Sequence, residues 1–323
     1  MSSTRHQLHY VDNQDGWQLE LKQCHPPKRV IKKRRPVCII PGYGMNNHIF
    51  GYHPSGLSME SYFVREGFEV WSVNLRGQGG SHWLGGDRHY GLYDLGLVDL
   101  PIAIRHIVEH SKSDTGQVDL IGCSLGGTLA YLYAALDKQN HAGALIGMGA
   151  PLRWEKVHPL LKMFCYSPKL VGKIPVFGVR EIMLSLWDRL QKSPFLKIYC
   201  HPEIVDLSEP EQILATIENP VRTINQEIAL WVREKDLHLN GHNLTEAFRQ
   251  VDNPLLCVLA NADGVVPPLT ALSPLEIARS KVKDTLVVGT DKLQYAHVDL
   301  FISRHSHDLV FRPVAQWLKR QTA

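Results

Sequence analysis

One strand, turn and helix near the middle of the chain constrain its fold more than any other feature. The stretch 118–121 (Val-Asp-Leu-Ile), apolar except for Asp119, runs into residues 122–126 (Gly-Cys-Ser-Leu-Gly), and an Ala- and Leu-rich helical pattern continues to about residue 137. A turn between a buried strand and a helix is strained, and only glycine tolerates the crowding around its serine. We therefore expect Gly122 and Gly126 to leave room for a Ser124 hydroxyl above the edge of a sheet. The N-terminus of the following helix would point its dipole at that hydroxyl.

The segments on either side of this turn alternate apolar runs with helical patterns. Continuous apolar runs bounded by turn formers are typical of strands buried on both faces of a parallel sheet. Such alternation implies right-handed crossovers, so we predict an α/β protein with a doubly wound, mostly parallel sheet. An antiparallel hairpin over 7–11 and 17–23 would form one edge. The predicted strands are 37–40, 68–75, 118–122, 142–149, 255–260 and 285–288, and the predicted helices include 57–66, 93–110, 125–137 and 307–319.

The alternation stops between residues 152 and 253. This segment has several helical patterns with exposed-looking aromatic residues and prolines, and no convincing strand. We predict that it is a helical cap inserted into an α/β core made of residues 1–151 and 254–323. Its aromatic and aliphatic stripes indicate either a pocket for an apolar group or the packing of the cap on the core.

Two residues that follow later strands are candidates to activate Ser124. A serine hydroxyl is a weak nucleophile unless a base removes its proton, and the base needs an acid to hold its tautomer. Asp263 follows the next-to-last predicted strand and His297 follows the last, which gives the chain order serine, acid, histidine. His305 and His307 are alternative bases, but they fall at the start of the last helix, where we expect surface or structural histidines.

Residues 41–45 (Pro-Gly-Tyr-Gly-Met) form the candidate loop for stabilising negative charge. Acyl transfer needs N–H donors for the developing oxyanion, which in this topology come from the residue after the nucleophile and from the loop after the third strand. We expect these donors to be the backbone N–H groups of Leu125 and Tyr43. Cys123, one residue before Ser124, should point away from the site.

The charge balance excludes one class of partner. The chain has 323 residues and a formal net charge of +3, whereas nucleic-acid binding requires a concentrated basic face. We therefore expect no nucleic-acid partner. The one concentrated basic run, within 28–35, is interpreted as a solvated turn between two strands; peripheral contact with an anionic surface such as a membrane is the alternative.

Cysteine usage and the N-terminus indicate the compartment. The six cysteines are dispersed, several of them inside apolar runs, and neither a metal-binding nor a disulfide spacing is present. We expect no metal and no cofactor. The N-terminus lacks the apolar stretch of a secretory signal, and no window reaches the roughly 18 apolar residues of a membrane span. The sequence therefore favours a soluble protein in the cytoplasm.

These residues together resemble the α/β-hydrolase superfamily over nearly the whole chain outside the predicted cap. Residues 41–46 and 74–81 look like the oxyanion loop and the glycine loop of lipase-like and acid-lipase-like members. Residues 126–129 (Gly-Gly-Thr-Leu) are similar to the helix start in polyhydroxyalkanoate synthases. Those synthases have a cysteine nucleophile where this chain has Ser124, and lipases have a histidine where it has Pro41.

The resemblance implies a serine hydrolase of the esterase or lipase type, acting on a small-molecule or lipid-like ester with a hydrophobic acyl group. Ser124 would attack the acyl carbonyl, His297 would shuttle the proton and Asp263 would orient His297. Two alternatives stay open. One is acyl transfer to an alcohol or thiol, as in the polyester synthases, and the other is a non-catalytic α/β-hydrolase module that binds a ligand or partner in its pocket.

Overall fold

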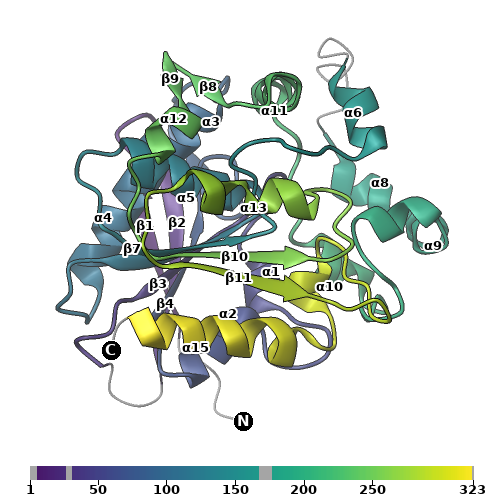
Figure 1. Ribbon diagram of the computed structural model, residues 1–323, viewed down its shortest axis with the longest axis horizontal. Coiled ribbons are helices and arrows are strands. Elements are labelled where there is room, and N and C mark those ends of the chain that lie inside the picture. Colours follow the sequence, from purple (N-terminus) through teal and green to yellow (C-terminus); the bar gives the residue numbers. More distant parts are fainter. Residues whose placement is uncertain (1–5, 27–30, 167–176, 322–323) are drawn as a thin grey trace.

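The computed structural model describes residues 6–26, 31–166 and 177–321, and a mixed sheet runs through its centre (Figure 1). Its strand order is β1-β2-β4-β3-β6-β7-β10-β11, with the short β5 paired to β2. Neighbours from β4 to β11 are parallel, whereas β2 is antiparallel to β1, β4 and β5. The strands are β1 (His6–Asp12), β2 (Trp17–Cys24), β3 (Val37–Ile40), β4 (Val70–Asn74), β5 (His82–Trp83), β6 (Val118–Cys123), β7 (Ala142–Met148), β10 (Leu255–Ala260) and β11 (Lys283–Val288).

The central strands are buried and mostly apolar, with Ser72 and Asn74 in β4 and Asp119 in β6 as their polar residues. Every residue of β3, β4, β6, β7 and β10 is buried, as expected when helices cover both faces of a parallel sheet. Each strand predicted from the sequence is present, with ends that differ by at most two residues. The doubly wound, mostly parallel sheet is therefore confirmed.

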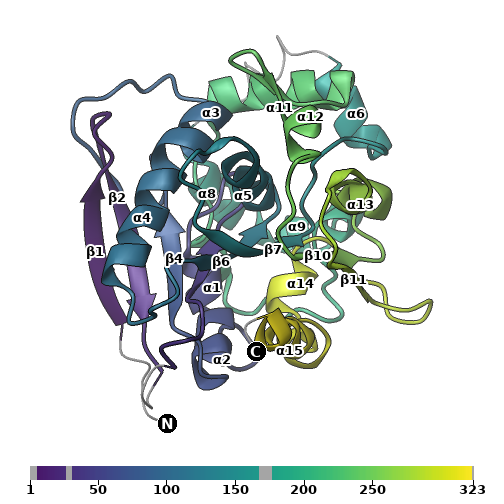
Figure 2. The same cartoon turned by 60° about the vertical axis from the view of Figure 1, so that its left-hand side comes forward.

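The predicted N-terminal hairpin forms one edge of the sheet, where β1 and β2 stand at the left of Figure 2. Its turn is fixed by Asn13, whose Oδ1 accepts the N–H groups of Asp15 and Trp17 at 2.9 and 3.0 Å. Gly16 has φ +76°, and a Cβ there would lie 2.3 Å from the backbone nitrogen of Gly86. This turn therefore requires glycine.

Helices cover both faces of the sheet. Helices α2 and α15 lie against one face and α4, α5 and α13 against the other (Figures 1 and 2), and one apolar cluster fills each side. The predicted helices 93–110 and 307–319 each contain a π-helical turn, which a search for regular helical spacing does not anticipate. These elements are α1 (His48–Gly51), α2 (Met59–Arg65), α3 (Leu92–Asp94), η1 (Leu95–Asp99, π), α4 (Leu100–His110), α5 (Leu125–Leu136), α13 (Pro268–Ile277), α14 (Asp299–Ile302), η3 (His307–Phe311, π) and α15 (Arg312–Gln321).

Between β7 and β10 the chain leaves the sheet as residues 152–253, which we call the insertion. It is largely helical, and α8 to α10 lie beyond the carboxyl ends of β10 and β11 (Figure 1). A small antiparallel hairpin, β8–β9, was not predicted, because two-residue strands carry no periodicity. The described elements are α6 (Pro159–Cys165), α8 (Val179–Ser185), α9 (Trp187–Gln191), η2 (Pro194–Ile198, 3-10), α10 (Pro210–Leu214), α11 (Arg222–Glu234), β8 (His238–Leu239), β9 (His242–Asn243) and α12 (Leu244–Phe248).

The aromatic residues of the insertion divide into two groups. Phe164, Tyr166 and Phe177 are exposed as the sequence suggested, but the insertion's three tryptophans are buried. The ring of Phe248 packs 5.0 Å from that of Tyr131 in α5, so the end of the insertion shares its core with the sheet. No helix in the described ranges is both long and apolar enough to cross a membrane.

Part of the basic run 28–35 has structural partners. Lys28 and Arg29 lie outside the described residues. The Arg35 Nε donates to the buried Asp119 at 2.5 Å. The guanidinium of Arg34 lies 4.9 Å from the ring centroid of Phe68. These two cations anchor the connection between β2 and β3, and contact with an anionic surface stays a prediction.

Candidate active site

Ser124 lies in a strained turn between β6 and α5. Its φ of 53° and ψ of −124° are rarely adopted by residues other than glycine. A Cβ on Gly122 would lie 2.2 Å from the Gly127 Cα, and a Cβ on Gly126 would lie 2.3 Å from the Ile40 carbonyl oxygen. Real atoms do not approach so closely, so both glycines are required for this turn.

The side chains of Ser124 and its neighbour Cys123 have different surroundings. Ser124 is half-buried, and within the described ranges its hydroxyl makes no hydrogen bond. Cys123 is 1% exposed, and burial raises the pKa of its thiol well above the usual value. Because the thiolate is the reactive form of cysteine, we expect Cys123 to act as a packing residue and not as a nucleophile.

Asp263 and His297 meet beyond the carboxyl ends of β10 and β11. The Nδ1 atom of His297 lies 2.7 Å from Oδ2 of Asp263, and both residues are buried. The other carboxylate oxygen, Oδ1, accepts the N–H groups of Val265 and Val266, both at 2.8 Å. Donors on both oxygens fix the orientation of the carboxylate. With Nδ1–H donating to Asp263, Nε2 of His297 is left as the basic nitrogen.

Ser124 and His297 both lie beside the end of β7. Met148, its last residue, accepts the backbone N–H of Ser124 at 2.8 Å. The next residue, Gly149, has φ +56°, and a Cβ there would lie 2.9 Å from Cε1 of His297 and 3.3 Å from Oδ2 of Asp263. The three residues selected from the sequence therefore adjoin one strand end. The structure pairs Asp263 with His297, whereas His307 bonds to the Leu57 carbonyl.

The two predicted oxyanion donors lie next to Ser124. Leu125 opens α5 directly after the serine, and Tyr43 follows Gly42, where a Cβ would lie 3.1 Å from the Ser124 Cβ. In the described part of the chain, neither the Tyr43 nor the Leu125 N–H donates to an acceptor. Both donors are thus unengaged beside the hydroxyl.

The insertion is hydrogen-bonded to the loop that carries Tyr43. The N–H of Asn46 donates to the Thr216 carbonyl at 2.9 Å, and the N–H of Glu218 donates to the Gly44 carbonyl at 2.8 Å. The Tyr43 hydroxyl also donates to the side chain of Asn225 in α11. These contacts were not predicted, since no local pattern in the sequence indicates which residues of a distant segment will pair.

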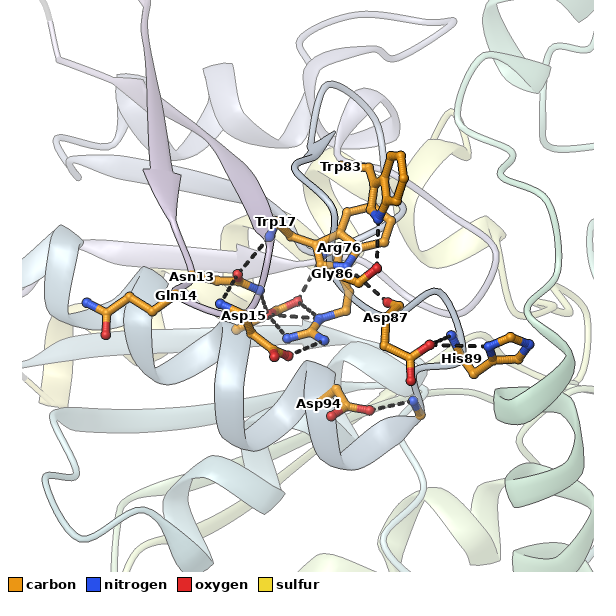
Figure 3. Close-up of polar contacts among 12 residues, drawn as sticks. Asn13, Gln14, Asp15, Trp17, Arg76, Trp83, Gly86, Asp87, His89 and Asp94 are labelled. Carbon is orange, nitrogen blue, oxygen red and sulfur yellow. Dashed lines mark hydrogen bonds and ion pairs between the residues drawn. The ribbon is translucent and has the colours of Figure 1, made fainter.

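The glycine loop after β4 is anchored by Arg76. The guanidinium is buried, with a two-pronged contact to Asp99 and a 2.7 Å contact to Asp15 (Figure 3). A buried cation requires such partners because removing it from water is costly. Further along the loop, the N–H of Gly79 donates to Oε1 of Glu218 at 3.0 Å. Arg76 therefore holds this loop against η1 and the turn of the N-terminal hairpin, and Gly79 joins the loop to the insertion.

A small cavity lies beside the loop 41–45. Its volume of about 20 Å³ has room for about one water molecule. Apolar side chains of the core and of the insertion contribute to its lining: Leu95, Leu125, Leu129, Val221 and Ile224. Across the described ranges, no group of three or more His, Cys, Asp and Glu residues is arranged to hold a metal ion.

The sheet order, the covering helices and the strained serine turn define an α/β-hydrolase. Residues 32–288 match the family described as serine aminopeptidase, S33, and the chain belongs to that family. The matched region contains Ser124 and Asp263 and ends before His297.

Among curated proteins, the chain is similar to the poly(3-hydroxyalkanoate) polymerase subunit PhaC of Haloferax mediterranei. The two are 21% identical over 239 residues, which is 67% of this chain and 46% of that protein. The chain thus spans under half the length of the relative it matches.

Solved structures show the same fold. A soluble variant of monoglyceride lipase from Saccharomyces cerevisiae superposes with a TM-score of 0.66 at 15% identity, covering 100% of this chain and 97% of the lipase. A bromoperoxidase from Bacillus anthracis also gives 0.66 at 15% identity, covering 97% and 100%. An esterase from Thermogutta terrifontis gives 0.61 at 16% identity, covering 98% and 100%. At these identities the likeness confirms the predicted α/β-hydrolase fold alone.

Proposed function

We propose that this hydrolase cleaves carboxylic esters through an acyl-enzyme intermediate on Ser124. The observation that carries the proposal is the buried hydrogen bond between His297 and Asp263, beside the strand end that also binds the Ser124 N–H. That bond holds the imidazole in the tautomer whose Nε2 accepts a proton.

In the first half-reaction, Ser124 Oγ attacks the acyl carbon while Nε2 of His297 takes the hydroxyl proton. The N–H groups of Tyr43 and Leu125 receive the negative charge that develops on the carbonyl oxygen. His297 then gives the proton to the leaving alcohol as the ester C–O bond breaks. In the second half-reaction, water attacks the acyl carbon and gives a proton to His297. His297 then returns that proton to Ser124 Oγ as the acyl C–O bond breaks and the free acid leaves. No cofactor is needed.

The insertion is proposed to act as a cap over this site. Its residues Val221 and Ile224 line the cavity together with leucines of the core, which supports an apolar acyl group. Because that cavity holds about one water molecule, we expect ester binding to require a displacement of the insertion. A series of p-nitrophenyl esters of increasing chain length tests this, since a shaped apolar cavity should give an optimum in kcat/KM.

An aminopeptidase activity, which the family description names, has weaker support here. It would need a carboxylate to bind the substrate's α-ammonium group. Glu218 is the one carboxylate among the described lining residues. Its Oε1 already accepts hydrogen bonds from the Asn46 side chain and the Gly79 N–H. Aminoacyl p-nitroanilides therefore belong in the substrate panel, and we expect them to be poorer substrates than the esters.

Labelling with a fluorophosphonate tests the proposal directly. We expect one adduct, located on Ser124 by peptide mass spectrometry, with loss of esterase activity in proportion to labelling. Ser124→Ala should neither be labelled nor cleave a p-nitrophenyl ester. An unlabelled wild-type protein without turnover would instead support a non-catalytic binding module.

Acyl transfer is the second candidate, and the similarity to the polymerase subunit favours it. It shares the acyl-enzyme step and differs in the acceptor. Product analysis with a competing alcohol distinguishes the two: a hydrolase releases mainly the free acid, whereas a transferase forms mainly the new ester.

A further inference from the structure

A second buried histidine–aspartate pair lies two residues from the proposed base. The Nδ1 atom of His201 is 2.9 Å from Oδ2 of Asp299. Asp299 is fully buried and His201 is 8% exposed. We assign the N–H to Nδ1 of His201, so that the imidazole donates a hydrogen bond to Oδ2 of Asp299. The proposed reaction uses neither residue.

The carboxylate of Asp299 accepts hydrogen bonds from the backbone of two segments, the loop that carries His297 and the insertion. The N–H of Ala296 donates to Oδ2 at 2.7 Å, and the N–H of His201 donates to Oδ1 at 3.0 Å. Ala296 and Asp299 flank His297 in the chain. The Asp299 side chain therefore constrains the loop that carries His297 and links that loop to the insertion.

The same stretch of the insertion contacts the loops of the base and of the acid. The N–H of Val298 donates to the Tyr199 carbonyl at 2.9 Å, and the N–H of Gly264 donates to the Ile198 carbonyl at 3.2 Å. Val298 follows His297, and Gly264 follows Asp263. Residues 198–201 therefore bridge the loops that carry Asp263 and His297, and the His201–Asp299 bond is a buried side-chain contact within this bridge. The buried Cys200 thiol also bonds to Asp299.

We propose that His201 and Asp299 are a positioning pair that holds the His297 imidazole against Asp263 and couples the insertion to the base. The pair does not touch the reacting atoms; it sets the loop from which His297 projects. The kinetic part of this inference rests on the proposed ester hydrolysis. The geometric part does not, because the His297–Asp263 bond can be observed without turnover.

The test compares His201→Ala with His201→Asn in the full chain. The asparagine amide can replace the Nδ1 donor, whereas alanine leaves Asp299 without it. We expect His201→Ala to lower kcat by about tenfold to a hundredfold with KM nearly unchanged, because a small misplacement of a catalytic group has an effect of this size. His201→Asn should recover most of the rate. Thermal unfolding is measured alongside to register any loss of stability.

Proton NMR gives a measurement that would not change if His201 and Asp299 only stabilised the fold. A proton shared by an imidazole and a carboxylate resonates far downfield, and the His297 signal is identified by its loss in Asp263→Asn. We expect that signal to broaden or shift upfield in His201→Ala and to return in His201→Asn. A folded His201→Ala protein with an unchanged His297 signal and unchanged kcat would overturn the proposal, even if its melting temperature were lower.

The proposal can still be tested if His201→Ala fails to fold or if the wild-type protein is inactive. If His201→Ala does not fold, His201→Gln takes its place, because it fills the space but displaces the amide from the Nδ1 position. If the wild-type protein shows neither labelling nor ester turnover, the proposed function fails, and the NMR comparison alone decides whether the pair positions His297.

Discussion

The Nδ1 atom of His297 and the Oδ2 atom of Asp263 lie 2.7 Å apart although 34 residues separate them in the chain. The two loops that carry them follow adjacent parallel strands, β10 and β11. Since parallel strands end at the same edge of the sheet, the topology itself places acid and base side by side.

Replacing this acid should remove most of the activity without unfolding the protein. We expect Asp263→Asn to lower kcat by about 10⁴-fold, because an amide at this position favours the imidazole tautomer with its proton on Nε2. Steady-state hydrolysis of a p-nitrophenyl ester measures the effect. Asp252→Asn is the control, since Asp252 is exposed and pairs with Arg279. Equal kcat values for the two variants would rule out Asp263 as the orienting acid.

Cys123 should be dispensable for turnover. Its thiol is buried and its pKa is raised by burial, so iodoacetamide should leave esterase activity intact in the folded protein. We expect Cys123→Ala to keep kcat within about threefold and to lower the free energy of unfolding by about 1 kcal/mol, from the loss of packing. Inactivation by the thiol reagent that Cys123→Ala abolishes would show that the cysteine takes part.

Gly149→Ala should impair the base specifically. Both Gly149 and Gly116 have positive φ, +56° and +65°, but only a Cβ at Gly149 would press on His297; at Gly116 the space is open. We expect alanine at either position to cost about 1 kcal/mol of backbone strain. Only Gly149→Ala should also lower kcat, by at least tenfold, as a shift of the imidazole would cause. A similar kcat for both variants would contradict contact between residue 149 and a working base.

Tyr43→Phe separates the backbone of Tyr43 from its side chain. The hydroxyl bonds to Asn225 and accepts the Val221 N–H at 3.3 Å, whereas the proposed oxyanion donor is the backbone N–H. We expect the free energy of unfolding to fall by about 1 kcal/mol, the usual value for one hydrogen bond. The kcat should stay within a few-fold of the wild type. A loss of a hundredfold or more would mean that the hydroxyl itself acts in the reaction.

Stability should fall as the pH is lowered, in part through His53. Burial and the nearby His307 lower the pKa of His53 to about 4. In the fold, Nδ1 of His53 accepts the Ser55 N–H at 3.0 Å, and Nε2 lies 2.9 Å from the Ser306 hydroxyl. Protonation of Nδ1 would break the first of these bonds.

The direction of this pH effect on stability follows from the difference in proton binding between the folded and unfolded states. Between about pH 6.5 and pH 4 the unfolded chain binds more protons at His53 than the folded protein does, so the stabilisation is complete above this window and is lost on acidification. We expect the wild type to lose about 2 kcal/mol more than His53→Gln between pH 7 and pH 4. Urea unfolding at each pH measures this, and parallel curves for the two proteins would exclude the effect.

The local parts of the fold were predictable because each depends on a short pattern. Buried strands such as β3 and β10 are continuous apolar runs, and the strained turn at Ser124 needs glycines at fixed offsets. The pairing of Asp263 with His297 agrees with their selection from the sequence, where each follows a strand in the order expected. The π-helical turns and the β8–β9 hairpin were not predicted, because neither changes the spacing of apolar residues enough to be recognised in the sequence.

The sequence by itself determined the sheet, the serine turn and the order of the candidate residues, because these follow from residue spacing and from the steric limits of glycine and serine. Only the tertiary structure decided how the insertion binds the loops of Tyr43, Asp263 and His297, and that Asp299 is paired with His201. Those contacts join segments about 100 residues or more apart in several cases. No local pattern records such a pairing, since it is settled by which buried polar groups find partners when the whole chain packs.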